Sequence, residues 1–211
     1  MRLSCSLRLC LPAFLSVVAA SGQDPILERI WEGVQGAQAA VTTACGTLTE
    51  TRTSELFSRP RVFRGNFCAA GAVKFWLEYL EPEKIILRFN TDFLNVTTSR
   101  RTGFATEVIQ VGQHVRRTEQ YFSGENAIEN LKRNFSIQAV ESGDTYLLKL
   151  VPRSSRFAGR VNYVAVGLGR DNFLPRSIEI DGKSGVRSVF AIAITSKNTR
   201  LDEAIFHVYR P

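Results

Sequence analysis

The stretch Gly65–Phe89, GNFCAAGAVKFWLEYLEPEKIILRF, decides the fold. Apolar and polar residues alternate along it, which is the period of a β-strand with one buried face. Its apolar positions are Val73, Phe75, Leu77 and Tyr79, followed by Ile85, Leu87 and Phe89. Glu81-Pro82-Glu83 interrupts the alternation, because proline cannot donate a hydrogen bond inside a sheet. The stretch therefore predicts two antiparallel strands that share one apolar face.

The same alternation continues on both sides of this hairpin. The threonine-rich segment 41–53, VTTACGTLTETRT, has the composition of a strand, and Ser58–Arg61 (SRPR) is typical of a turn. Downstream apolar stripes are Tyr146, Leu148 and Leu150; Val161, Tyr163 and Ala165; Ile178 and Ile180; and Phe206 and Val208 in an expected C-terminal strand. Ser188–Thr195 is apolar on both faces, which predicts a strand covered on both sides. The chain is thus expected to be mainly β (α+β), with one antiparallel sheet.

Two helices are predicted to accompany the sheet. Asp24 is a candidate cap and Pro25 suits a first helical turn. The apolar side chains that follow lie at i, i+3, i+4 and i+7, and they are Leu27, Ile30, Trp31 and Val34. A second helix is expected near residues 125–135, where Ile128, Leu131 and Phe135 recur on one side.

A single sheet must cover its apolar face, and two modest helices cover only part of it. A strongly curved sheet with these helices at its mouth leaves an apolar cavity that suits acyl chains, although an ordinary packed core is the alternative. The expected lining is the more apolar stripe of each strand: Phe75, Leu77, Ile85, Leu87, Phe89, Tyr146, Leu148 and Leu150. A slip of one residue in register would turn these side chains to the other face.

The amino terminus has the pattern of an export signal. Two arginines precede Leu9–Ala20 (LCLPAFLSVVAA), an apolar run too short to span a bilayer of about 30 Å. Small residues follow, so cleavage is expected after Ala20 or Gly22. We therefore divide the chain into a signal peptide, residues 1–22, and one domain, residues 23–211. Neither Cys5 nor Cys10 follows the small residues that a lipid-anchored signal requires, so the mature protein is expected to carry no anchor.

Composition argues against nucleic-acid binding and catalysis. Loss of the two leader arginines lowers the formal net charge from +7 to +5, and acidic residues are interleaved with the remaining basic ones. A nucleic-acid binder more often gathers its charge into one stripe. The two histidines, His114 and His207, form no metal-binding or catalytic motif, and no nucleotide-binding loop is present. We expect no enzyme activity, no metal and no cofactor; an unrecognised hydrolase is the least favoured hypothesis.

Two cysteines remain after cleavage, Cys45 and Cys68. An exported protein with a lone pair more often forms a disulfide than a metal site, and two independent buried thiols are the alternative. Residues that face each other in a hairpin have numbers with a constant sum. The midpoint of this pair falls between Leu56 and Phe57, inside the window expected for the turn, so a disulfide is predicted.

The carboxyl-terminal half resembles the LolA-type outer-membrane lipoprotein carrier family. The residues that carry the resemblance are Leu131–Pro152 (LKRNFSIQAVESGDTYLLKLVP), Val161–Leu168 (VNYVAVGL), Phe173–Ile178 (FLPRSI), Asp181–Gly185 (DGKSG), and then Asn198, Leu201, Phe206 and Pro211. The amino-terminal helix and first hairpins fit in order, so the resemblance covers nearly the whole mature chain. It implies an incomplete antiparallel β-barrel with helices as a lid over an apolar cavity.

The resemblance also implies a role. It points to a periplasmic, monomeric carrier of lipoprotein or other lipid acyl chains, with an inner-membrane donor and an outer-membrane acceptor as partners. The alternative is an envelope regulatory protein of the same fold that senses a lipid or a partner. One departure concerns the transfer of the lipoprotein to its acceptor. The family often has Arg-Pro four and three residues before an aromatic residue. Here Gly71-Ala72 stands at those positions before Phe75, and Lys74 is the nearest base.

Overall fold

The computed structural model describes residues 24–71, 74–90, 93–100, 103–110 and 127–208. The predicted signal peptide, Val73, His114 and Pro211 lie outside these ranges. The elements in chain order are α1 (Pro25–Ala40), β1 (Thr43–Ser54), β2 (Arg61–Ala70), β3 (Lys74–Glu81), β4 (Ile85–Phe89), β5 (Phe93–Arg100), β6 (Gly103–Gln110), α3 (Ala127–Asn134), β7 (Phe135–Ser142), β8 (Thr145–Pro152), α4 (Ser155–Ala158), β9 (Val161–Gly169), β10 (Pro175–Gly182), β11 (Val186–Lys197) and the 3₁₀ helix η1 (Glu203–Phe206).

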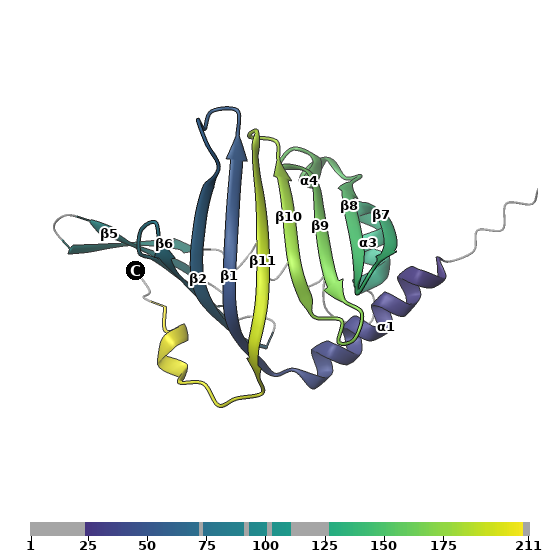
Figure 1. The fold of residues 1–211 in the computed structure, drawn as a ribbon, viewed down its shortest axis with the longest axis horizontal. Helices are drawn as coiled ribbons and strands as arrows, with labels where there is room; N and C mark the ends of the chain where they lie inside the picture. Colours follow the sequence, from purple (N-terminus) through teal and green to yellow (C-terminus); the bar gives the residue numbers. More distant parts are fainter. Residues whose placement is uncertain (1–23, 72–73, 91–92, 101–102, 111–126, 209–211) are drawn as a thin grey trace, which may run out of the picture.

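One antiparallel sheet of eleven strands forms the body of the protein, in the order β6-β5-β4-β3-β2-β1-β11-β10-β9-β8-β7. The strands are two meanders, β1 to β6 and β7 to β11, that meet where β1 pairs with β11 near the middle of the sheet (Figure 1). β6 and β7 form the two edges, so the sheet is not closed into a barrel. The prediction of a mainly β fold with an open antiparallel sheet and two helices is confirmed.

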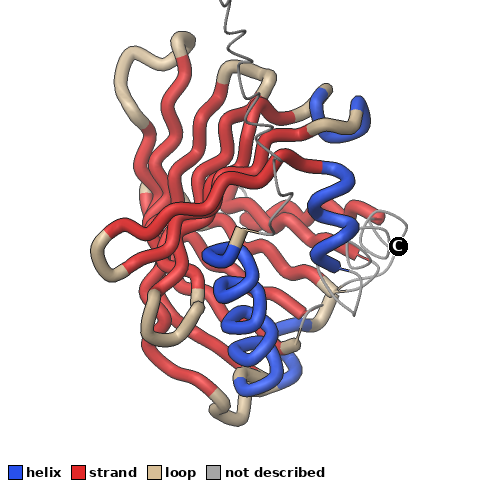
Figure 2. Tube along the Cα trace, turned by 90° about the vertical axis from the view of Figure 1, so that its right-hand side faces the viewer, coloured by secondary structure: helices blue, strands red, loops and turns tan. Residues whose placement is uncertain are grey.

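The two longer helices lie on the same side of the curved sheet (Figure 2). Asp24 caps α1, because its side chain accepts a hydrogen bond from the backbone N–H of Ile26 at 3.0 Å. Ile30 of α1 is completely buried against the β7–β9 end of the sheet, and Leu131 of α3 is buried beside it. No helix in the described ranges is long and apolar enough to cross a membrane.

Strand pairing shows which side chains share the face toward these helices, called the inner face from here on. Residues directly opposite each other in an antiparallel pair point to the same side of the sheet. The pairs Tyr146–Leu168 and Leu148–Val166 lie under α1. Across the sheet, Leu48–Ile192 and Phe67–Leu77 continue the same face. The inner face is therefore apolar along most of the sheet.

Two expectations about the strands are wrong, and one predicted stripe lies on the outer face. Tyr163 and Ala165 lie on the outer face. β9 is apolar on both sides, so alternation alone does not show which of its two stripes faces the helices. The outer face of β11 is not covered: its alanines, Ala191 and Ala193, are exposed, and their small side chains made the strand look buried.

The C-terminal strand that was expected to include His207 is absent, since the 3₁₀ helix η1 ends at Phe206. The Asp202 side chain caps this helix by accepting from the Ala204 N–H at 2.9 Å. η1 packs against β3 and β4, and the ion pair between Lys74 Nζ and Glu203 Oε2, 2.5 Å long, fastens it there. The alternating pattern of Phe206 and Val208 thus reflects two residues that are buried without a strand.

Candidate functional site: an apolar cavity beneath two helices

A cavity of about 160 Å³ lies between α1, α3 and the β7–β9 end of the inner face. Every side chain that lines it is apolar. The lining residues are Leu27, Ile30, Trp31, Val34, Leu131, Ile137, Leu148, Leu150, Val166 and Leu168. Such a space offers a ligand hydrophobic contact alone, without a hydrogen-bond donor or acceptor to fix a polar group.

The helices contribute half of this lining through one stripe of α1 and one residue of α3. All four residues of the expected α1 stripe reach the cavity, because positions i, i+3, i+4 and i+7 fall on one side of a helix. Leu131 enters from α3, where it packs with Phe135 and Leu150. The side chain of Ile128, the other residue expected on this lid, lies outside what the structure describes.

An aromatic stack holds α1 close to the sheet. Phe173, in the β9–β10 loop, stacks on Tyr146 with ring centroids 5.6 Å apart and planes 14° apart. α1 approaches this stack at Gly33, where an added Cβ would lie 2.3 Å from a Phe173 ring carbon. Only glycine fits there without movement of the ring or the helix. No local pattern pointed to Phe173, because the contact joins segments that are far apart in the chain.

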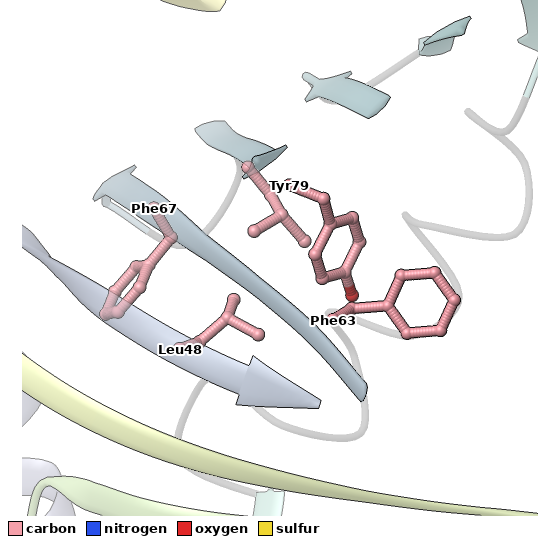
Figure 3. Close-up of a cluster of buried hydrophobic side chains, with 5 residues drawn as sticks. Leu48, Phe63, Phe67 and Tyr79 are labelled. Atoms are coloured by element: carbon pink, nitrogen blue, oxygen red, sulfur yellow. The ribbon is translucent and has the colours of Figure 1, made fainter. Parts of the chain in front are cut away.

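The cavity residues expected from the sequence fall into two groups. Tyr146, Leu148 and Leu150 lie on β8 beneath α1 and α3. Phe75, Leu77, Ile85 and Leu87 lie on β3 and β4, in a second apolar cluster with Leu48, Phe63, Phe67 and Tyr79 (Figure 3), and Phe89 pairs with Phe75 beside them. Five strands separate β3 from β8 in the sheet. The structure thus places all eight on the inner face but does not bring them into one pocket.

The residues that reasoning from the sequence missed come mainly from β9 and β7. Val166 and Leu168 line the cavity from β9, and Ile137 lines it from β7. Ile137 had no assigned role because its strand carries polar residues at neighbouring positions. Val166 could have been found as the partner of Leu148, but only if the register between β8 and β9 had been known.

A buried carboxylate lies on the inner face, at the far end of the second cluster. The Glu50 side chain is 2% exposed and accepts hydrogen bonds from Arg52 Nε at 2.5 Å, from Arg52 NH2 at 2.9 Å and from the Tyr79 hydroxyl. The hydroxyl end of Tyr79 lies beside Phe63, whose ring also faces the Arg52 guanidinium at 4.4 Å (Figure 3).

Burial alone would raise the pKa of Glu50, but the hydrogen bonds from Arg52 and Tyr79 and the Arg52 charge outweigh it and hold that pKa below its usual value. The carboxylate is therefore ionised and fully engaged, which makes it a poor general base. Among the described residues, no three His, Cys, Asp or Glu side chains are grouped so that they could hold a metal ion.

The predicted cysteine pair is bonded in the structure. Cys45 on β1 lies directly opposite Cys68 on β2, with Cα atoms 4.1 Å apart and an S–S bond of 2.05 Å. The register of this hairpin puts the turn between Ser54 and Arg61, around the predicted midpoint. The disulfide thus ties the first two strands at the end where α1 joins the sheet.

Gly71, at the position where the resembled family often has arginine, adopts a backbone conformation that suits glycine. Gly71 has a φ of +58°, in the left-handed region that favours glycine over a residue with a side chain. Lys74, the nearest base, points to the outer face and is paired with Glu203 of η1. No basic side chain from these two positions therefore reaches the cavity.

Several solved structures are similar to this chain. A LolA superfamily protein from Nitrosomonas europaea is 15% identical with a TM-score of 0.40, and the similarity covers 86% of this chain and 97% of that one. An uncharacterized conserved protein from Thermus thermophilus is 13% identical with a TM-score of 0.49, over 88% and 92% of the two chains. Lipoprotein LppX from Mycobacterium tuberculosis is 14% identical with a TM-score of 0.46, over 85% and 99%.

No protein-family model matches the chain, and no curated protein matches it.

Proposed function

We propose that the mature protein binds the acyl chains of a lipid or lipoprotein against the inner face of its sheet and carries them through the cell envelope toward the outer membrane. The observation that carries the proposal is the wholly apolar cavity beneath α1 and α3. The cavity attracts a ligand through the hydrophobic effect, and its lining has no group that needs a hydrogen bond from that ligand. Alkyl chains are the ligand class that meets both conditions.

The size of the cavity requires α1 to move when a chain binds. Ligand pockets typically measure about 300–1,000 Å³, and this one holds about 160 Å³. Each methylene group that leaves water is worth about 0.8 kcal/mol. A chain that slides between α1 and the sheet therefore replaces the apolar contacts that the helix gives up, and the exchange stays close to balanced.

The polar contacts of α1 suit a lid that opens readily. In the described part of the chain, one ion pair joins an α1 side chain to the sheet, from Arg29 NH1 to Glu141 Oε1 at 3.5 Å. Its arginine is 64% exposed, and exposed pairs of this kind contribute only about 0–1 kcal/mol. A carrier must release its load, and a helix held mainly by apolar contacts can be displaced by an acceptor that offers the same contacts.

Two features together support the proposed compartment. The leader pattern of residues 1–22 predicts export, and the Cys45–Cys68 disulfide suits an oxidising compartment such as the periplasm. There the protein would meet a donor at the inner membrane and an acceptor at the outer membrane. The carrier role needs no catalytic group, and we propose that the protein is not an enzyme.

Binding of a fluorescent long-chain fatty acid analogue tests the cavity. Val34→Phe fills the space from α1 while keeping it apolar, so we expect weaker binding by this variant than by the wild type. Gln35→Phe is the matched control, because Gln35 is the exposed neighbour on the same helix. Equal binding by all three proteins would contradict the cavity as the acyl site.

The carrier role is tested separately with two vesicle populations. Catalytic amounts of the protein should speed transfer of a labelled lipid from donor to acceptor vesicles, and Val34→Phe should slow that transfer relative to Gln35→Phe. Stoichiometric binding without any acceleration of transfer would contradict the carrier role and leave a lipid-binding protein of another kind.

A further inference from the structure

Two arginines face each other at one end of the inner face. Arg52 on β1 lies directly opposite Arg61 on β2, and like charges in this arrangement repel. The carboxylate of Glu50, on the same strand as Arg52, is already engaged by Arg52 and Tyr79. Arg61 is exposed, and among the described residues it forms no ion pair; its guanidinium lies 4.6 Å from the centroid of the Phe57 ring.

A hollow of about 600 Å³ opens beside Arg61, within the size range of ligand pockets. It lies where β2 runs past the end of β3, whose last paired residue is Glu81, and it is bounded by the β1–β2 loop and the β3–β4 turn. The side chains that line it include Arg59, Arg61, Phe57, Phe63 and Glu83. Its charged lining therefore holds two arginines against one carboxylate.

Phe63 connects this hollow to the apolar inner face. It lines the hollow and also belongs to the buried cluster with Leu48, Phe67 and Leu77. An amphiphile with its polar end between Arg59 and Arg61 would thus place its first methylene groups on Phe63. Guanidinium groups suit this polar end, because their planar fork donates paired hydrogen bonds to phosphate or carboxylate oxygens.

We propose that this hollow is the headgroup site for the amphiphile that the protein carries, and that it selects an anionic phosphate or carboxylate head. Arg61 and Arg59 bind the head, and the chain continues over Phe63 and across the inner face toward the cavity beneath α1. This assignment rests on the proposed function, since it takes the inner face as the place where acyl chains bind. Glu83, at the rim, opposes the anion and weakens its binding.

Three amphiphiles that share a decyl chain test the proposal, each below its micelle concentration: decyl phosphate, decyl maltoside and decyltrimethylammonium. Titration calorimetry at low salt should show that decyl phosphate binds the wild type about tenfold more tightly than the cationic ligand. Arg61→Gln should remove most of this preference, and Glu83→Gln should increase it. Arg200→Gln, which removes an exposed cation elsewhere on the protein, is the matched control and should leave the preference unchanged.

The possible outcomes separate the two proposals. Equal binding of all three ligands to the wild type would overturn the headgroup site while supporting acyl-chain binding, and failure of all three to bind would overturn the proposed function itself. Inorganic phosphate is the remaining ligand: if it binds as tightly as decyl phosphate, the hollow is a simple anion site and the amphiphile assignment is wrong. A loss of preference in Arg200→Gln equal to that in Arg61→Gln would also overturn it.

Discussion

Replacement of Gly33 by alanine tests how α1 is seated on the sheet. An added Cβ would lie 2.3–2.4 Å from three ring carbons of Phe173. Carbon atoms in contact are normally about 3.5–4.0 Å apart, so the ring or the helix must shift by more than about 1 Å. The ring is not free to turn away, because it stacks on Tyr146. Overpacking of this kind typically costs about 1–3 kcal/mol.

Gly36 provides the matched control on the same helix. A Cβ added at Gly36 meets no atom within 4 Å, so Gly36→Ala tests helix propensity alone. Both substitutions gain about 1 kcal/mol from replacing glycine inside a helix. We therefore expect Gly33→Ala to be less stable than Gly36→Ala by about 1–3 kcal/mol, which corresponds to a melting temperature about 2–12 °C lower for a domain of this size.

Thermal unfolding followed by circular dichroism measures this difference, and a dye that binds apolar pockets gives a second readout. If the clash displaces α1, Gly33→Ala should bind more dye at a temperature where both variants are folded. Equal melting temperatures together with equal dye binding would refute the close packing of α1 on Phe173.

Three further predictions concern the rest of the fold. Glu50→Gln should destabilise the protein by about 1–3 kcal/mol at neutral pH; because the pKa of Glu50 is lowered on folding, the ionised group stabilises the protein above its unfolded pKa of about 4.3, and the difference from wild type in urea unfolding should shrink as the pH falls below that value. Asn198 has a φ of 55°, which glycine tolerates, and its side chain hydrogen-bonds Thr42 N and the Ala40 carbonyl between α1 and β1. Asn198→Gly should therefore speed amide hydrogen exchange in α1 without unfolding the sheet, and unchanged exchange would contradict the view that Asn198 holds the end of α1 in place. Replacing Cys45 and Cys68 together by alanine should lower stability by about 3 kcal/mol in the chain-entropy model, and the denatured, unreduced wild-type protein should show no free thiol; finding two would show that the disulfide does not form.

Local patterns were enough to predict the elements whose neighbours are close in sequence. The α1 stripe follows from helical spacing alone, and each of its four residues reaches the cavity. The β1–β2 hairpin could be registered from one constraint, the midpoint of Cys45 and Cys68, because pairing numbers in a hairpin have a constant sum. The strands around Phe75 and Leu87 were predicted from alternation broken by a proline.

Contacts between distant segments escaped prediction for physical reasons. β9 is apolar on both faces, so only its pairing with β8 decides that Val166 rather than Tyr163 faces the helices. Phe173 reaches Gly33 across about 140 residues of chain, and no local pattern encodes such a meeting. The separation of the expected lining into two clusters follows from the order of the strands, which places β3 and β8 in different meanders with five strands between them.

The central claim is that an acyl chain binds on the inner face beneath α1. Photo-crosslinking with a palmitic acid analogue that carries a diazirine near the chain end tests this directly, because mass spectrometry then identifies the peptides that the chain touches. We expect crosslinks to α1, residues 25–40, and to β8 and β9, residues 145–152 and 161–169, and their loss when unlabelled palmitate is added in excess. Crosslinks confined to the exposed outer face, or labelling that excess palmitate does not reduce, would contradict the claim.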